Sequence, residues 1–239
     1  MRRTFETVGP WAVLVCALAV PVKGDLITNG GFESGFTGWT TLNQLGSEGT
    51  FVAQSGTLSP VNLFAVPSPP GGIVAAMTDS FGPGSHVLYQ DFVVPNSITI
   101  GFAISFSLFI NNANGAPNFF VPATLDFSTP ALNQQARIDI IRTSSDPFSV
   151  AGADVLRVLY QTLPGNALAS GYTNFTADLT TLLQANLGQT LRLRFAEVDN
   201  VAPFNMGVDN VSIDAVPEPS TWIMMSGGLL ALGFAKRRR

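Results

Sequence analysis

The fold is decided by the stretch Ile98-Thr99-Ile100-Gly101-Phe102-Ala103-Ile104-Ser105-Phe106-Ser107-Leu108-Phe109-Ile110-Asn111. Large apolar side chains recur there at every second position from Ile100 to Leu108, and this period places them on one face of a long strand. A shorter stretch, Leu191-Arg192-Leu193-Arg194-Phe195, alternates apolar and basic residues. It predicts a second strand that is buried on one face.

Similar short apolar runs fill residues 25–215, divided by clusters of Gly, Pro, Asn and Ser. With the two regions above (98–111 and 190–198), ten strands are expected, the other eight at Phe51–Gln54, Val61–Val66, Ile73–Met77, Val87–Val94, Phe119–Phe127, Ala136–Arg142, Val155–Thr162 and Gly207–Ile213. Asp178–Leu187 is expected to form a helical turn. Many strands without a long helix predict an all-β domain, an antiparallel β-sandwich.

The charge of this β-rich body is strongly acidic. Between Asp25 and Ala215 there are five arginines and no lysine, against fourteen acidic residues. Such a body should repel nucleic acid and anionic lipid, so nucleic-acid binding is excluded. The one cysteine, Cys16, lies in the N-terminal apolar run, where a lipoprotein cysteine is the alternative reading.

Residues 1–24 have the features of a secretory signal peptide. Arg2-Arg3 is followed by the ten-residue apolar run Trp11–Val20, which is too short to span a bilayer. Cleavage is expected before Asp25, with a site after Ala17-Leu18-Ala19 as an alternative. An uncleaved anchor remains open.

Residues 216–239 form a tail of three parts. The turn Pro217-Glu218-Pro219 ends the body, the apolar segment Trp222–Ala235 is expected to form a single short transmembrane helix, and the basic cluster Lys236–Arg239 closes the chain. A helix of that length covers roughly 21 Å, against roughly 30 Å of hydrocarbon. The segment is therefore short for a permanent anchor.

The three parts of this tail together resemble the PEP-CTERM sorting signal of Gram-negative, often biofilm-forming bacteria. The matching residues are Pro217, Glu218 and Pro219, the apolar segment, and the basic end. The resemblance implies export, transient anchoring in the inner membrane, and recognition by an exosortase that releases or transfers the body. A plain C-terminal tail anchor is the alternative.

Two other segments resemble the first and last strands of galactose-binding-like jelly rolls, which include carbohydrate-binding modules. They are Leu26–Glu33, followed by Gly38-Trp39, and Phe204–Ile213. The resemblance implies a jelly-roll form of the sandwich and a structural calcium ion joining the two segments. By position, Glu33 and Asp209 would supply carboxylates and Asn29 a carbonyl. The alternative is that Glu33 and Asp209 cap turns or accept hydrogen bonds from backbone amides.

Residues able to perform catalysis are few, and no catalytic residue is assigned. His86 is the one histidine, and at the head of a strand it is expected to be solvated or to cap a turn. The acidic pairs Asp126 with Asp139 and Glu197 with Asp199 could in principle act on glycosides. Sparse carboxylates of this kind are more often surface groups or turn formers.

The leading hypothesis is a non-enzymatic exported protein of the cell surface or of the extracellular polysaccharide matrix. A second hypothesis is a secreted glycan-binding module that uses Tyr89, Tyr160 or Tyr172, because Trp39 is expected to plug the core. A third is a secreted glycoside hydrolase or lyase, which requires two carboxylates within about 10 Å in a cleft.

Overall fold

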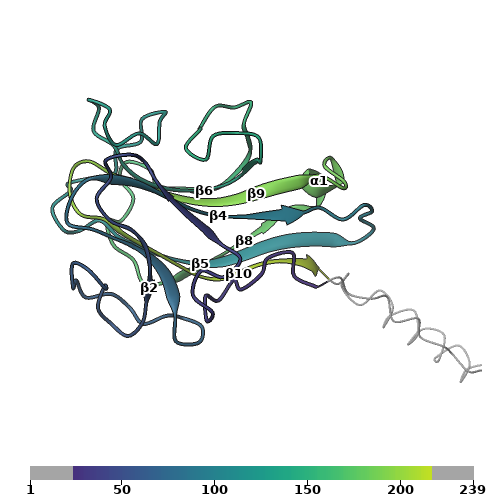
Figure 1. Ribbon diagram of the computed structural model, residues 1–239, viewed down its shortest axis with the longest axis horizontal. Coiled ribbons are helices and arrows are strands. Elements are labelled where there is room, and N and C mark those ends of the chain that lie inside the picture. The colour runs from purple at the N-terminus through teal and green to yellow at the C-terminus, as the bar shows by residue number, and fades with distance from the viewer. Residues whose placement is uncertain (1–23, 217–239) are drawn as a thin grey trace, which may run out of the picture.

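The computed structural model describes residues 24–216 of the chain. Within this range ten strands form two five-stranded antiparallel sheets that lie face to face (Figure 1). The first sheet has the order β1 (Thr40–Asn43), β4 (Gly84–Val93), β9 (Thr190–Asp199), β6 (Gln134–Arg142) and β7 (Val155–Gln161). The second has the order β2 (Thr50–Gln54), β3 (Ala75–Asp79), β10 (Asn205–Val216), β5 (Gly101–Asn111) and β8 (Thr173–Asp178). The predicted all-β antiparallel sandwich is thereby confirmed.

The core between the sheets contains the side chains that the alternating patterns placed there. Phe102, Ile104, Phe106 and Leu108 of β5 are all buried in it. Leu191, Leu193 and Phe195 of β9 meet them from the other sheet. At one end the short helix α1 (Thr180–Gln184), predicted as a helical turn, closes the core with its buried residue Leu183.

The outer face of the first sheet is also covered, so β9 is buried on both faces rather than on one. Val87, Ala196 and Val198 pack there against Leu125 and the partly buried Phe127, which belong to the long connections between strands. Loops therefore shield a second, smaller apolar cluster.

This covered face also holds a buried ion network. Arg194 is fully buried and donates from Nη1 to the carbonyls of Pro147 and Ser149, both at 2.7 Å. Its Nη2 pairs with Asp139, which also accepts from Nε of Arg137 at 2.7 Å. Buried charges need partners of this kind because desolvation is otherwise costly.

Several strand boundaries differ from the prediction. Val61–Val66 is not a strand, because the carboxylate of Asp79 holds the amides of Val61 and Asn62. In the predicted strand Phe119–Phe127, only Phe120 pairs, with Gln134. The strands β1 and β8 were missed, since their exposed sequences TTLN and TNFTAD lack an apolar run.

The segment expected to be the first strand, Leu26–Glu33, consists of turns and bends instead. It nevertheless lies beside β10. The amide of Leu26 donates to the carbonyl of Ile213 at 3.0 Å, and the amide of Val211 donates to the carbonyl of Gly30 at 2.9 Å. A side chain at Gly30 would place Cβ 1.8 Å from the oxygen of Val211, so this close approach requires glycine.

The targeting segments fall mostly outside the described residues. This holds for residues 1–23 of the expected signal peptide, for Pro217–Pro219 and for the apolar segment Trp222–Ala235. Val216, expected to open the tail, is the last residue of β10 and pairs with Gly101. Among residues 24–216, no helix combines the length and hydropathy needed to cross a bilayer.

Candidate functional site

A cleft opens between the edge strands of the two sheets. The strand β7 ends the first sheet, β8 ends the second, and the cleft of about 290 Å³ lies between them. Its lining residues are Leu108 and Ile110 of β5, Tyr160 of β7, Thr173 and Phe175 of β8, and Asn166, Ala167 and Ser170 of the loop between β7 and β8. Apolar and hydrogen-bonding groups are thus brought to one concave place.

Aromatic rings form one side of this cleft. The ring centroid of Tyr160 lies 5.0 Å from that of Phe175, in an edge-to-face arrangement. Phe175 in turn stacks on Phe106 of the core, with centroids 5.4 Å apart and planes 16° apart. Since Phe106 is buried, the two rings exposed to the cleft are held by the core behind them.

The loop that completes the cleft is fixed to the end of β5. The amide of Ser170 donates to the carbonyl of Ile110 at 2.9 Å, and the amide of Asn112 donates to the carbonyl of Leu168 at 2.7 Å. The side-chain oxygen of Asn166 accepts from the amide of Leu163 at 2.7 Å. These bonds form the wall of the cleft without a ligand.

The other aromatic candidates are engaged elsewhere. Tyr89 lies under the guanidinium of Arg192, with the cation 4.0 Å from its ring centroid. Tyr172 packs against Phe109, with centroids 5.7 Å apart. Trp39 is buried against Phe32 and confirms the expected core plug.

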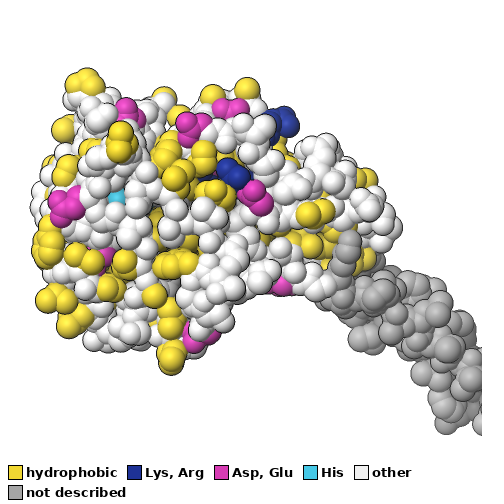
Figure 2. All heavy atoms as spheres, viewed as in Figure 1, with side chains coloured by type: hydrophobic (Ala, Val, Ile, Leu, Met, Phe, Trp, Pro, Cys, Tyr) yellow, Lys and Arg dark blue, Asp and Glu magenta, His cyan; other side chains and the backbone are white. Residues whose placement is uncertain are grey.

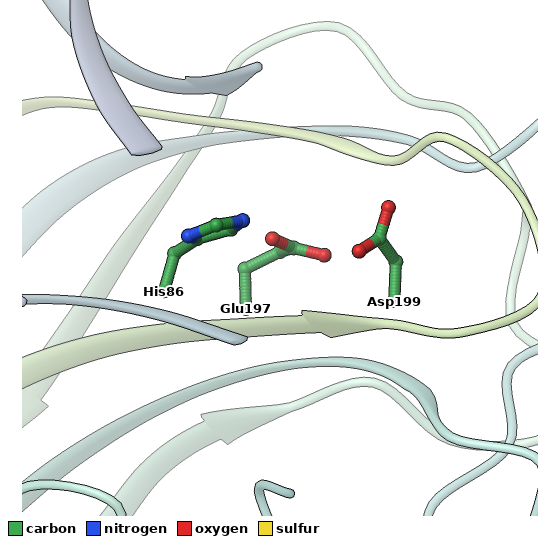
Figure 3. A group of neighbouring side chains, drawn as sticks. All are labelled: His86, Glu197 and Asp199. Atoms are coloured by element: carbon green, nitrogen blue, oxygen red, sulfur yellow. The ribbon is translucent and has the colours of Figure 1, made fainter. Parts of the chain in front are cut away.

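A second polar constellation lies inside the sandwich, where His86 of β4 meets Glu197 and Asp199 of β9 (Figure 3). One ligand atom from each of the three side chains lies within 4.8 Å of the others. All three residues are about 1% exposed. The expectation that His86 is solvated or caps a turn is therefore wrong, as is a surface position for the two acids.

Burial controls the protonation of this trio. It lowers the pKa of His86 to about 4, opposed by the nearby carbonyl of Glu48. Burial, and then the charge of Asp199, raise the pKa of Glu197 well above its ordinary value. Burial also raises the pKa of Asp199 to about 7, against a hydrogen bond from the amide of Gly84.

The other predicted acidic pair is not brought together as a pair. Asp139 belongs to the buried ion network with Arg194 and Arg137. Asp126 accepts hydrogen bonds from Gln44 and Ser128, which lower its pKa. Asp139 therefore pairs with arginines of β6 and β9, and Asp126 with polar side chains of the loops.

The residues predicted to hold calcium lie where the N-terminal segment meets β10. Glu33 accepts from the amides of Ile73 and Val74, and Asp209 accepts from the amides of Gly71 and Asn210. These contacts are the alternative foreseen for both acids.

The third predicted calcium residue, Asn29, is also occupied within its own turn. Its backbone oxygen accepts from Nε1 of Trp39 at 3.1 Å. Burial, with a smaller contribution from the charge of Glu33, raises the pKa of Asp209 to about 6. Two carboxylates thus lie close enough in space to repel each other where calcium was expected.

The C-terminal residues indicate how the protein is sorted. Residues 215–239 match the PEP-CTERM protein-sorting motif. The PEP-CTERM motif indicates a protein that is exported and sorted to the cell envelope, and it implies processing by an exosortase. The predicted sorting resemblance is confirmed by this match.

Comparison with other proteins adds little beyond the tail. A search of curated proteins finds no match. One similar solved structure is TmCBM61 in complex with β-1,4-galactotriose, at 10% identity and TM-score 0.48, covering 81% of this chain and 100% of that chain. Another is the K3 cleaved adhesin domain of Lys-gingipain from Porphyromonas gingivalis, at 13% identity and TM-score 0.46, covering 80% and 98%. At these values the similarity says nothing about what this chain binds.

Proposed function

We propose that this protein is a non-enzymatic, exported module that binds polysaccharide through the cleft between β7 and β8. The observation that carries the proposal is the pairing of Tyr160 and Phe175 in a cleft that also presents Asn166, Ser170 and Thr173. Sugars have an apolar face of C–H groups and an edge of hydroxyls. The aromatic rings of the cleft can pack against the apolar face of a sugar, and its polar side chains can hydrogen-bond to the hydroxyls.

The charge of the body narrows the ligand to neutral glycans. Between Asp25 and Ala215 the chain has five arginines and fourteen acidic residues. Basic side chains are sparse on the face seen in Figure 2, where acidic ones are more frequent. An acidic polysaccharide would be repelled by this field, and a neutral one would not.

The sorting tail supports a location beside such polymers. Export and exosortase processing would deliver the module to the cell surface or to the extracellular matrix. The short apolar segment Trp222–Ala235 would anchor the chain in the inner membrane until the exosortase acts. Bound polysaccharide would then retain the released body.

The trio inside the sandwich favours binding over hydrolysis. Glycosidases place their two carboxyl groups about 5–5.5 Å or about 6.5–9.5 Å apart, on either side of the scissile bond. Glu197 and Asp199 offer oxygens within 4.8 Å of each other and both are buried between the sheets. A sugar ring cannot pass between them there.

The structural calcium ion remains part of the proposal. Carboxylate and carbonyl oxygens from Asn29, Glu33 and Asp209 are the ligands that calcium prefers. Both amides bonded to Glu33 go to its Oε1, which leaves Oε2 for a cation, and each carboxylate oxygen of Asp209 keeps a further lone pair after accepting one amide. A bound calcium ion would offset the repulsion between Glu33 and Asp209.

The test of glycan binding is an array of neutral and acidic polysaccharides probed with the full chain. We expect binding to neutral glycans that is lost in Tyr160→Ala and kept in Tyr89→Ala, which removes a tyrosine outside the cleft. Binding that survives Tyr160→Ala, or binding to no glycan, would refute the proposed function.

A further inference from the structure

We propose that His86, Glu197 and Asp199 form a binding site for a divalent cation of the first transition series, of the zinc class. The site is distinct from the polysaccharide cleft and from the calcium position at Asp209. It is built from two neighbouring strands of one sheet and faces the interior of the sandwich (Figure 3).

The register of the sheet places the three ligands. In the β4–β9 ladder His86 pairs directly with Glu197, and Gly84 pairs with Asp199. Direct partners in an antiparallel ladder project to the same side, and so do residues two apart on one strand. The backbone therefore fixes the three side chains on one face, as a prearranged site requires.

Two polar atoms of the trio are left without a partner. Nε2 of His86 and Oε1 of Glu197 are both buried and make no hydrogen bond to any of residues 24–216. An unsatisfied buried polar atom destabilises the folded state, so folded proteins seldom keep two side by side without an occupant. The side chains that carry them each offer a ligand atom within 4.8 Å of the other (Figure 3).

The tautomer of His86 suits a metal. Nδ1 lies 2.9 Å from Oδ1 of Asn43, and an amide oxygen can only accept. In the tautomer that matches this orientation of the Asn43 amide, the proton sits on Nδ1 and the lone pair of Nε2 is free to bind a metal. Metal-binding histidines are commonly oriented by a hydrogen bond of this kind at the other nitrogen.

The absence of a side chain at Gly84 keeps the space beside Nε2 of His86 open. A Cβ at Gly84 would lie 2.4 Å from Nε2 of His86 and 2.9 Å from the carbonyl oxygen of Glu48. Asp199 also lines a pocket of about 140 Å³, together with Phe81, Gly82, Pro83 and residues 200–203. This pocket gives a cation a route from solvent to Asp199.

The ligand set selects the class of metal. One imidazole nitrogen with two carboxylates suits zinc and its neighbours, whereas calcium and magnesium prefer oxygen ligands alone. The charges also match, because two ionised carboxylates balance a divalent cation. Open coordination positions would be filled by water from the pocket.

Zinc titration of the full chain tests the proposal. The protein is prepared without a polyhistidine tag, stripped of metal with a chelator and titrated with Zn²⁺ in the presence of excess Ca²⁺ and Mg²⁺. We expect one Zn²⁺ per chain, with affinity at least tenfold weaker in Glu197→Gln, which keeps the shape of the side chain. Asp214→Asn, which changes an exposed carboxylate of β10, should leave zinc affinity unchanged.

Spectroscopy on the unmodified chain gives a readout that needs no variant. His86 is the one histidine in the sequence, so any imidazole nitrogen coupled to bound Cu²⁺ in an electron spin-echo experiment must come from it. We expect that signal at one Cu²⁺ per chain. Absence of stoichiometric binding, a bound ion without imidazole coupling, or unchanged zinc affinity in folded Glu197→Gln would each overturn the proposal.

Discussion

Glu197 lies directly opposite His86 in the β4–β9 ladder, and both side chains are buried inside the sandwich. Further along the same two strands the inward positions hold Leu88 and Phe195, which belong to the apolar core. The core is therefore apolar over most of its length and polar at the end where β9 leaves the sheet. That polar end is separate from the edge cleft proposed to bind polysaccharide.

The buried ion network on the covered face is expected to be essential for stability. Asp139→Asn leaves Arg194 charged, fully buried and without its carboxylate, which should lower the free energy of unfolding by about 3–5 kcal/mol. Chemical denaturation measures this. The control is Asp91→Asn, because Asp91 pairs with Arg192 but is 38% exposed, and its loss should cost at most about 1 kcal/mol. Equal losses in the two variants would contradict the assignment.

The contact between the N-terminal segment and β10 depends on the absence of a side chain at Gly30. Gly30→Ala would push Cβ into the carbonyl of Val211 and should destabilise the protein by about 1–3 kcal/mol. Gly152→Ala is the matched control, since nothing lies within 4 Å of a Cβ there. Thermal unfolding should show a clear loss for the first and little change for the second. The packing described would be wrong if both variants melted alike.

Removal of calcium should destabilise the same region. Chelation with a calcium-selective agent is expected to lower the melting temperature of the wild type, because a ligand bound to the folded state stabilises it. In Asp209→Asn, which lacks one of the proposed calcium ligands, the same treatment should have no effect. A wild-type melting temperature that does not respond to chelation argues against the calcium ion.

Sorting is expected to depend on the turn before the apolar segment. Replacing Pro217, Glu218 and Pro219 with alanine should block exosortase recognition, so the unprocessed chain would accumulate in the inner membrane. Mass spectrometry of the mature protein and surface labelling measure processing and display. Alanine at Ser220 and Thr221 serves as the control. Normal processing of the triple variant would remove the role given to this turn.

The sequence predicted the core better than the edges of the sheets. Alternation in 98–111 and 191–195 identified β5 and β9 and the faces that they turn toward the core, but not the burial of the outer face of β9 under loops. The edge strands β1 and β8 carry mostly polar, exposed residues, and a pattern based on apolar side chains does not detect them. The apolar segment 61–66 was wrongly predicted to be a strand. Its first amides donate to the carboxylate of Asp79 instead of to a neighbouring strand.

The trio was partly foreseeable. Glu197 and Asp199 continue the same period-two face as Leu193 and Phe195, which signals that they point inward. The sequence alone could not place His86 beside these two acids. The pairing of β4 with β9 joins strands far apart in the chain, and no local pattern encodes it. The cleft beside Tyr160 was hidden for the same reason, since it needs two edge strands from different sheets.

The most direct test of the central claim is calorimetry of the full chain with the neutral polysaccharide that binds best on the array. Wild type and Tyr89→Ala should bind with the same affinity, and Tyr160→Ala should bind at least tenfold more weakly, a loss of about 1.4 kcal/mol or more. All three proteins should have the same circular dichroism spectrum. Equal affinity in folded Tyr160→Ala and wild type would contradict the claim that the cleft between β7 and β8 binds polysaccharide.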